Sequence, residues 1–286
     1  MTEFKNKEFT KSTTQFENKE FTKSTTQFEN KEFTKSTTQF ENKVCFIPAR
    51  YPSTRLPGKP LLEIKGIAII ERVYQQVKKC HLVDKIIVLT DDKRIKDKVE
   101  SFGGNCEIVT EECLNGTERI IKYIQKNIDC CDLVINVQGD EPFIDPTAID
   151  KCIANYIKQT DSSVKCSTLH HKLDSEEEIR KRSNGKLVLD NFNNIMYCSR
   201  NIIPGTKKNE YDKHINYYGH IGIFVFDKTY LLEEYTKENT PNQLNEDIEW
   251  LKILEQGYRI NSVCVDDPEI SVDTKEDYIY LLDKYK

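Results

Sequence analysis

Between residues 44 and 159, short apolar runs alternate with segments whose apolar residues recur at helical spacing. The runs predict strands at 44–49, 85–90, 106–109 and 132–138. The periodic segments predict helices at 67–80, 92–102, 116–126 and 146–159. The run at 132–138 is almost entirely apolar, which is typical of a central parallel strand buried on both faces. This order predicts an α/β fold with a doubly wound, mostly parallel sheet and right-handed crossovers.

After residue 160 the pattern changes, because strands follow one another with little helix between them. They are expected at 164–170, 186–190, 195–199 and 217–226. Helices at 228–236 and 245–256, a strand at 260–265 and a helix from residue 274 complete the chain. We therefore expect a smaller antiparallel lobe over about 164–226. A lobe that covers the ends of a parallel sheet makes a natural site for a second substrate.

The N-terminal segment has a different composition from the rest of the chain. Residues 5–40 are three copies of a twelve-residue unit, and the second and third copies both read ENKEFTKSTTQF. Such a unit offers too little apolar surface to offset the entropy lost on ordering. We expect residues 1–42 to be disordered tandem repeats without a catalytic role, and residues 43–286 to be the folded domain. The alternative is a weak docking or assembly segment.

Charge and cysteine content narrow the class of protein. A formal net charge of −5 argues against a broad nucleic-acid-binding surface. The ten cysteines include no C-x-x-C pair and no cluster with zinc-ligand spacing, so reduced and mostly buried thiols are expected. No apolar run is long enough to span a bilayer, and the N-terminus lacks the apolar core of a signal peptide. These features predict a cytoplasmic protein without a membrane segment.

The strand at 44–49 runs directly into a turn-rich loop that carries three cations, Arg50, Arg55 and Lys59. Such loops at the carboxyl ends of strands in open α/β sheets bind phosphorylated ligands. Cations at this spacing suit the phosphates of a nucleoside triphosphate. Neither G-x-x-x-x-G-K-[ST] nor G-x-G-x-x-G is present, so we expect nucleotide chemistry unlike that of ATPases or dehydrogenases.

Carboxylates stand at two separate strand ends. Asp140 and Glu141 follow the strand at 132–138, and Asp273 precedes the last helix. Two aspartates from distant loops, together with a triphosphate, supply what one Mg²⁺ needs. The alternatives are a turn with solvated acids for the first pair, and a capping box with Asp273 as the N-cap and Glu276 at N3 for the last helix.

Four further positions allow both a structural and a functional interpretation. Residues 115–119 either cap a helix or hold a nucleobase with their backbone groups. His220 lies in an apolar strand, where a core role is usual. Arg200 ends a strand and is suited to bind a substrate carboxylate with two donors. Glu246 and Glu249 are one helical turn apart, which is typical of a solvated helix face.

Several motifs together resemble the 3-deoxy-manno-octulosonate cytidylyltransferase family, the CMP-Kdo synthetases. The family pattern I-P-A-R-Y-x-S-T-R-L-P-G-K-P-L is present at 47–61, and V-N-V-Q-G-D-E-P is close to residues 135–142. The patterns G-T-E-R, F-S-R, H-x-G-I-Y, E-x-L-E-Q-L and G-V-D-T are represented at 116–119, 198–200, 220–224, 246–251 and 271–274. The resemblance covers nearly all of 43–286 and none of the repeats.

The resemblance implies a fold like that of nucleotide-diphospho-sugar transferases and a role in lipopolysaccharide biosynthesis. It implies transfer of CMP from CTP to the anomeric hydroxyl of 3-deoxy-D-manno-octulosonate (Kdo), with release of pyrophosphate, by a Mg²⁺-dependent homodimer. The CTP phosphates would contact Arg50, Ser53, Arg55 and Lys59. Gly116 and Thr117 would frame the cytosine, and Asp140 and Asp273 would bind Mg²⁺. The sugar acid would contact Gln138, Arg200, His220 and Glu249. Within this set, Arg50, Lys59, Asp140 and Asp273 would carry the catalysis.

Departures from the family pattern include three positions near the expected site. Phe224 replaces a tyrosine, Gln243 replaces a glutamate, and Asn115 stands where serine is frequent. None of them lies in the cationic loop or at either aspartate. They leave two alternatives open: activation of another ulosonic acid, such as 8-amino-Kdo or a sialic acid, and a non-catalytic protein that binds nucleotide sugars.

Overall fold

The computed structural model describes residues 40–53, 55–207, 211–266 and 268–286. The N-terminal repeats lie outside the described residues except for Phe40, so their expected disorder stays a prediction.

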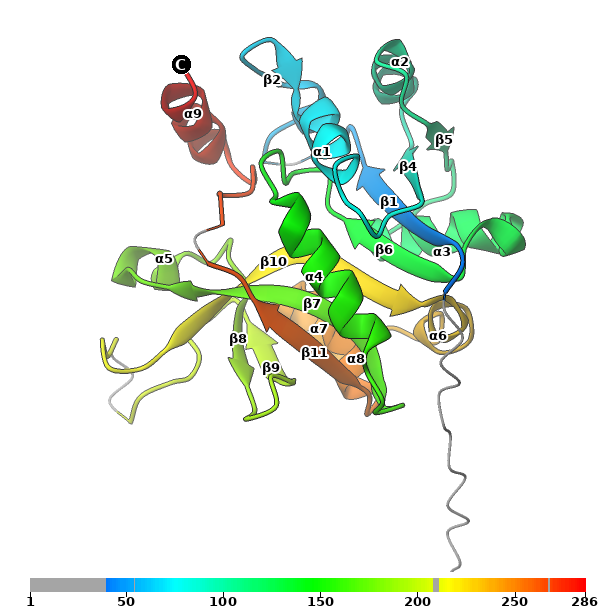
Figure 1. The fold of residues 1–286 in the computed structure, drawn as a ribbon. Helices are drawn as coiled ribbons and strands as arrows, with labels where there is room; N and C mark the ends of the chain where they lie inside the picture. The colour runs from blue at the N-terminus through cyan, green and yellow to red at the C-terminus, as the bar shows by residue number, and fades with distance from the viewer. Residues whose placement is uncertain (1–39, 54, 208–210, 267) are drawn as a thin grey trace, which may run out of the picture. The chain divides into compact units, whose positions relative to one another are not determined.

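One sheet organises the described part of the chain (Figure 1). Its order is β11-β7-β10-β6-β1-β4-β5, and β8 and β9 branch from β10. The strands are β1 (Lys43–Ala49), β4 (Lys85–Thr90), β5 (Cys106–Ile108), β6 (Leu133–Val137), β7 (Val164–Leu173), β8 (Lys186–Leu189), β9 (Ile195–Ser199), β10 (Tyr217–Asp227) and β11 (Arg259–Cys264). β1 pairs in parallel with β4 and β6, whereas β10 runs antiparallel between β6 and β7. The expected mostly parallel α/β sheet is therefore confirmed.

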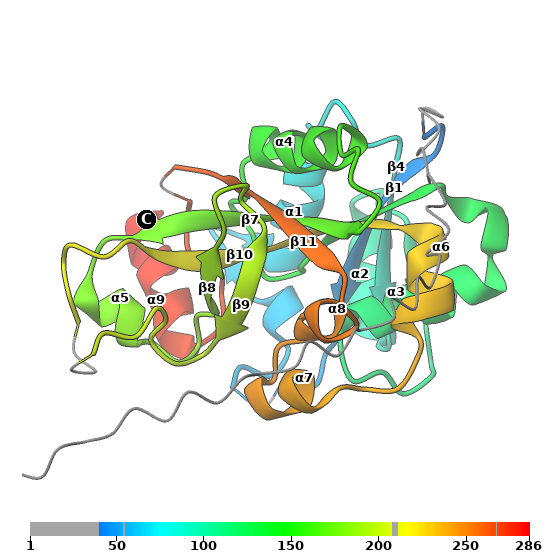
Figure 2. The ribbon, with the colours of Figure 1, turned by 90° about the horizontal axis from the view of Figure 1, so that it is seen from below.

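Helices cover both faces of this sheet, because successive residues of each central strand point to opposite sides. In β1, Cys45 and Ile47 are buried on the face covered by α1 (Ile69–Val77), α2 (Lys93–Ser101), α4 (Pro146–Ile157) and α9 (Lys275–Lys284). Val44 and Phe46 are buried on the face covered by α3 (Gly116–Lys126), α6 (Lys228–Tyr230) with its π-helical continuation Leu231–Tyr235, and α8 (Leu251–Glu255). Figure 2 shows α4 and α1 on one side and α3, α6 and α8 on the other.

The prediction of a single helix at 245–256 is wrong. The segment forms α7 (Pro241–Glu246) and α8, and the break falls at Asp247, whose φ of 53° is left-handed. A residue in this conformation ends a helix, and the N–H of Ile248 closes the turn on the carbonyl of Gln243. The irregular residues between the two helices lie at the cavity described below.

Smaller elements also differ from the sequence prediction. The first helix begins at Ile69, not at residue 67, because Ile67–Ala68 (β3) pairs with Glu63–Ile64 (β2). The short α5 (Glu176–Arg180), capped by Ser175, was not expected.

The expected antiparallel lobe shares its longest strands with the main sheet. β7 and β10 extend the central sheet, and only the β8–β9 hairpin leaves its path. β10 contains an irregularity relative to β7: Ile221 pairs with Leu169, but Phe224 pairs with the next residue, Thr168. Gly222 and the residue after it therefore form a bulge, a feature that often redirects side chains beside binding sites.

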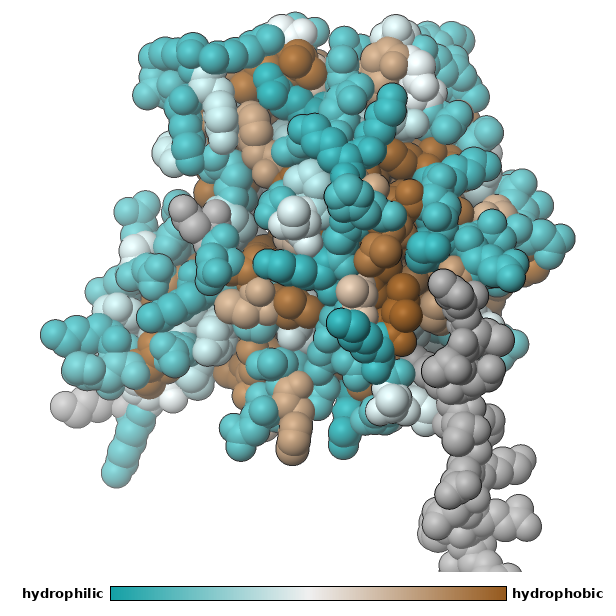
Figure 3. Space-filling model, viewed as in Figure 1, coloured by the Kyte–Doolittle hydropathy of each residue, from teal (hydrophilic) through white to brown (hydrophobic). Residues whose placement is uncertain are grey.

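The hydropathy of the surface and the state of the cysteines are those of a folded domain with a polar exterior. Hydrophilic residues cover most of the face seen in Figure 3, and apolar ones gather in a strip to the right of α4. None of the described helices is long and apolar enough to cross a membrane. All ten cysteines are free thiols, as expected.

Contacts at the start of the described fold predict where the chain tolerates truncation. The Phe40 ring packs against Tyr156 with centroids 6.3 Å apart. The N–H of Asn42 donates to Asp132 Oδ2 at 2.9 Å, and its carbonyl accepts from the N–H of Asp132 at 2.9 Å. Deletion of residues 1–42 removes these contacts, whereas deletion of 1–39 keeps them. We expect a Tm lower by about 5 °C for the longer deletion in a thermal melt. Equal Tm values would show that these contacts contribute nothing.

Candidate active site

The loop after β1 is folded by its own contacts. Gly58 has a φ of 69°, and a Cβ on it would lie 3.2 Å from the Tyr51 ring. The N–H of Gly58 donates to the carbonyl of Tyr51 at 3.1 Å, and the N–H of Leu56 donates to Ser53 Oγ at 3.3 Å. The left-handed turn and the close ring explain why glycine stands here. The turn directs Lys59 toward the end of β6.

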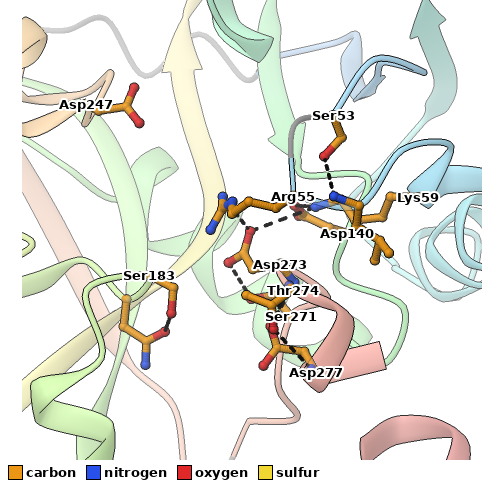
Figure 4. A network of polar contacts seen from close by, with 12 residues as sticks. Ser53, Arg55, Lys59, Asp140, Ser183, Asp247, Ser271, Asp273, Thr274 and Asp277 are labelled. Carbon is orange, nitrogen blue, oxygen red and sulfur yellow. Dashed lines mark hydrogen bonds and ion pairs between the residues drawn. The ribbon is translucent and has the colours of Figure 1, made fainter. Parts of the chain in front are cut away.

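Three charged segments meet at the carboxyl end of β6. Lys59 Nζ lies 2.7 Å from Asp140 Oδ2 and 3.9 Å from Asp273 Oδ1. Arg55 Nη2 lies 3.3 Å from the same oxygen of Asp273 (Figure 4). Burial alone would lower the pKa of Lys59, but the charges of Asp140 and Asp273 outweigh it and raise that pKa. Burial and the charge of Asp140 raise the pKa of Asp273.

Backbone contacts fix Asp273 beside Asp140. The N–H of Val272 donates to the carbonyl of Asp140 at 2.9 Å. The capping box expected at Asp273 and Glu276 is wrong, because Thr274 is the N-cap of α9 and Asp277 is its N3 partner. Asp277 also accepts from the N–H of Asp273 at 3.1 Å. The side chain of Asp273 is therefore released from capping and faces the cations.

A cavity of about 530 Å³ opens beside this charge cluster. That volume lies in the range of small-molecule sites. With one exception, every site residue expected from the sequence lines it: Arg50, Ser53, Arg55, Lys59, Gly116, Gln138, Asp140, Arg200, His220, Glu249 and Asp273. The exception is Thr117, which is 1% exposed and accepts from Asn136 Nδ2 through its Oγ1 at 3.2 Å. The structure thus gathers residues from seven separate segments around one space.

Arg50 differs from the other two cations of the loop. Its side chain is exposed at the cavity, and no ion pair or hydrogen bond from it to another described residue is found. Arg50 therefore offers an uncompensated positive charge to a ligand.

The start of α3 closes one end of the cavity. Asn115 is the N-cap and accepts from the N–H of Glu118 at 2.9 Å, as the structural interpretation of this motif predicts. Asparagine thus replaces serine without loss of the cap. A Cβ on Gly116 would lie 2.8 Å from Pro48, so glycine lets the helix approach the end of β1.

Glu249 lies at the centre of the opposite wall, and the solvated helix face expected for it is wrong. Its carboxylate accepts from Gln138 Nε2 at 3.3 Å and from the N–H of Thr117 at 3.4 Å. Burial raises the pKa of Glu249 to about 7. Glu246 is not solvated either, since it accepts from Ser199 Oγ at 2.6 Å and from the N–H of Arg200 at 3.0 Å.

Arg200 borders the cavity, but protein oxygens occupy its donors. Nη1 donates to the carbonyls of Arg182 and Ser183 at 3.2 and 3.1 Å. Nε donates to the carbonyl of Glu246 at 2.9 Å, and Nη2 to that of Asp247 at 2.8 Å. A two-donor contact with a substrate carboxylate would require some of these bonds to break. In this arrangement Arg200 ties the loop before β8 to the end of α7.

His220 combines a core position with a place at the cavity. Its Nε2 lies 2.8 Å from Thr168 Oγ1, which itself donates to the carbonyl of Ile223 at 2.6 Å. Because a hydroxyl has one proton, Nε2 must be the donor and Nδ1 carries the lone pair. Burial lowers the pKa of His220 to about 3, so the ring is neutral near pH 7.

Among the lining residues that were not expected as site residues, two bear on the chemistry of the cavity. Glu141 is buried and accepts from the N–H of Gly222 in the bulge at 3.2 Å. Burial and the charge of Asp140 raise the pKa of Glu141 to about 8. The other residue is Trp250, which occupies the position of the glutamine in E-x-L-E-Q-L. That substitution was the available signal, but sequence alone does not tell a cavity wall from a core tryptophan.

The number of carboxylates in the site limits how many ligands the protein can supply to a metal ion. Among the described residues, no group of three or more His, Cys, Asp or Glu side chains could hold an ion. Asp140 and Asp273 form a pair that already shares one ammonium group, that of Lys59. Such a pair suits an ion that takes its remaining ligands from phosphate and water, as Mg²⁺ does.

Comparison with known proteins agrees with this geometry. Residues 44–260 match the family described as cytidylyltransferase. A 3-deoxy-manno-octulosonate cytidylyltransferase of Fusobacterium nucleatum is 41% identical over 230 residues, 80% of this chain and 91% of that protein. The mitochondrial 3-deoxy-manno-octulosonate cytidylyltransferase of Arabidopsis thaliana is 38% identical over 234 residues, 82% of this chain and 80% of that protein. A solved structure of CMP:2-keto-3-deoxy-manno-octonic acid synthetase complexed with CTP matches with a TM-score of 0.77 and 30% identity, covering 85% of this chain and 98% of that one. The chain therefore belongs to the cytidylyltransferase family, among the 3-deoxy-manno-octulosonate cytidylyltransferases.

Proposed function

We propose that this chain transfers CMP from CTP to the anomeric 2-hydroxyl of Kdo, forming CMP-Kdo and pyrophosphate. The observation that carries the proposal is the ion-pair cluster of Lys59, Asp140 and Asp273 inside the cavity. In this cluster, a cation suited to phosphate directly contacts two carboxylates suited to a metal ion. The relatives named for this reaction, and the solved relative complexed with CTP, support the choice of substrates.

The cationic loop is the proposed subsite for the triphosphate. Arg50 has no ion pair among the described residues, and Arg55 is half exposed, so both can turn to phosphate oxygens. Ser53 holds the loop through Leu56 and adds a hydroxyl. Gly116 and the backbone of Thr117 frame the base end of this subsite, at the N-terminus of α3.

Asp140 and Asp273 fit a Mg²⁺ ion, because they form a carboxylate pair arranged around one positive charge. When bound there with CTP, Mg²⁺ would offset phosphate charge and make the attacking hydroxyl easier to deprotonate. Lys59 would then exchange its carboxylate partners for phosphate oxygens.

The protein contributes mainly positioning and charge compensation. The 2-hydroxyl attacks the α-phosphorus in line, and pyrophosphate leaves from the opposite side. Arg50 and Lys59 stabilise the charge that develops on the phosphates, by about 3 kcal/mol per donor in comparable sites. Gln138, His220 and Glu249 orient the sugar acid, and Arg200 maintains the wall behind it.

Two alternatives concern the acceptor and the activity. Phe224 lies on the acceptor side and lacks the tyrosine hydroxyl of the family pattern, which favours testing other ulosonic acids. Gln243 gives no such reason, because its side chain completes the capping box of α7 by accepting from the N–H of Thr240. The intact ion-pair cluster argues against a non-catalytic protein.

The proposal includes a homodimer formed through the β8–β9 hairpin. Phe192 and Met196 on this hairpin are 78% and 65% exposed, more than the other large apolar side chains of the described residues, and so offer apolar surface to a partner subunit. The cytoplasmic location and the lack of a catalytic role for the repeats stay predictions.

Pyrophosphate release from CTP and Mg²⁺ tests the function, with Kdo, 8-amino-Kdo and a sialic acid offered separately to the full chain. We expect the highest kcat/KM with Kdo, and a CMP–sugar phosphodiester in the ³¹P NMR spectrum. Asp140→Asn is the matched negative control, and its fold should survive while its turnover is lost. A clear preference for another sugar acid would contradict the acceptor, and near-normal turnover of Asp140→Asn would contradict the metal role.

The metal site generates a second prediction that does not depend on turnover. The ammonium of Lys59 compensates the negative charge of Asp140. Removal of the ammonium should therefore leave a carboxylate pair that attracts divalent cations. We expect Lys59→Met to bind Mn²⁺ about tenfold more tightly than the wild type without nucleotide, as measured by EPR. Arg50→Met is the control, because Arg50 has no ion pair with either aspartate and its loss should leave Mn²⁺ affinity unchanged. Unchanged or weaker Mn²⁺ binding by Lys59→Met would exclude this competition.

A further inference from the structure

Trp250 is the one tryptophan of the chain, and it lines the cavity beside Glu249. It lies in the irregular segment between α7 and α8, where the left-handed Asp247 interrupts the helix. Only 4% of its surface is exposed. A ring this well covered has a fixed orientation, so the edge that faces the cavity presents a defined surface to a ligand.

The bulge in β10 brings two further rings next to Trp250. His220 and Phe224 are four residues apart, and in a regular strand they would be about 13 Å apart. With the bulge between them, their ring centroids are 5.0 Å apart. Trp250 lies 4.8 Å from the His220 ring and 6.4 Å from the Phe224 ring. The three rings pack against one another and reach the cavity mainly with their edges, since Phe224 is 1% and Trp250 4% exposed; we call this cluster the aromatic wall.

The aromatic wall borders the residues proposed to hold the acceptor. A Cβ on Gly222, within the bulge, would lie 2.8 Å from Gln138 Cγ, so the bulge packs directly on Gln138. Gln138 in turn donates to Glu249, the residue next to Trp250 in the chain. The charge cluster with Lys59 lines the same cavity. The wall therefore faces the acceptor subsite.

The aromatic wall offers few polar atoms to a ligand: the Nδ1 lone pair of His220 as an acceptor and the indole N–H of Trp250 as a donor. Phe224 has no polar side-chain atom, and Nε2 of His220 is occupied by Thr168. No hydrogen bond from the indole N–H of Trp250 to a described residue is found, and that nitrogen is not among the buried polar atoms without a partner. Among the described residues, the indole N–H thus has no hydrogen-bond acceptor. It is the one obvious donor that this wall offers to a ligand.

We propose that Trp250 is a specificity-determining residue for the acceptor. The edge of its ring lies against a carbon of the sugar acid that carries hydrogens in place of hydroxyls, as the deoxygenated carbon of a 3-deoxy-2-ulosonic acid does. Its N–H donates to an oxygen of the sugar acid. A hydroxyl pressed against the edges of Trp250 and Phe224 would lose its bonds to water without a replacement, which disfavours sugars hydroxylated at that carbon. The inference rests on the proposed function, since it assigns a role within the same reaction.

Because the chain has a single tryptophan, its fluorescence reports on this position alone. The full chain is titrated with Kdo in the presence of Mg²⁺ and a CTP analogue whose α and β phosphorus atoms are joined by a methylene group. We expect a saturable change in fluorescence with Kdo, and little change with the analogue alone. A change with the analogue alone and none with Kdo would overturn the proposal.

Steady-state kinetics of two variants separate the ring from its N–H. Trp250→Phe keeps an apolar ring and loses the donor, whereas Trp250→Gln keeps a donor and loses the ring. We expect each to raise the KM for Kdo about tenfold, with the KM for CTP unchanged. Tyr230→Phe is the matched control: it removes the buried bond from Tyr230 to Gln256 in the same core cluster and should leave both KM values unchanged.

The outcomes distinguish this inference from the proposed function. If the wild type releases pyrophosphate with Kdo but both Trp250 variants keep its KM for Kdo, only the role of Trp250 is wrong. If the KM for CTP rises equally in these variants, Trp250 supports the whole cavity and is not a specificity residue. If the wild type forms no product with any sugar acid, the proposed function fails, while a fluorescence response to Kdo would still support the contact with Trp250.

Discussion

The structure depends on one buried charge arrangement, in which Lys59 compensates Asp140 and Asp273 at the carboxyl end of β6. Two carboxylates this close would repel each other strongly in a partly buried place. The ammonium of Lys59 removes that repulsion, and Arg55 adds a second cation on the outer side. The cluster joins the first loop, the fourth parallel strand and the last helix, which are far apart in the sequence.

The surrounding fold serves to hold these charges in place. Parallel pairing of β1 with β6 brings the first loop beside Asp140, and the bond from Val272 N–H to the Asp140 carbonyl does the same for Asp273. On the acceptor side, the bulge in β10 and the break before α8 place aromatic and carboxylate side chains along one wall. The cavity is therefore lined by the Lys59 cluster and also by a wall in which aromatic rings stand beside Glu249 and Arg200.

Much of this arrangement could be predicted from the sequence. The alternation of apolar runs and helical segments gives the sheet, because both periodicities are local properties of the chain. The residues of the first loop also follow from the sequence, since their motif is contiguous. The break at Asp247 could not be predicted, because a left-handed aspartate leaves no pattern in composition. The spacing of Glu246 and Glu249 therefore indicated a solvated helix face, and only the family resemblance implied a sugar contact for Glu249. The partners of Arg200 were missed for a related reason: they are backbone carbonyls from two loops, and such carbonyls have no sequence signature.

The central claim is that the cluster found here exchanges its partners when substrate binds. A crystal structure of the full chain with CTP and Mg²⁺ tests this most directly. The account predicts a metal ion between Asp140 and Asp273, with Lys59 moved from Asp140 to the phosphate oxygens. An unbroken Lys59–Asp140 ion pair, with the triphosphate bound elsewhere, would contradict it.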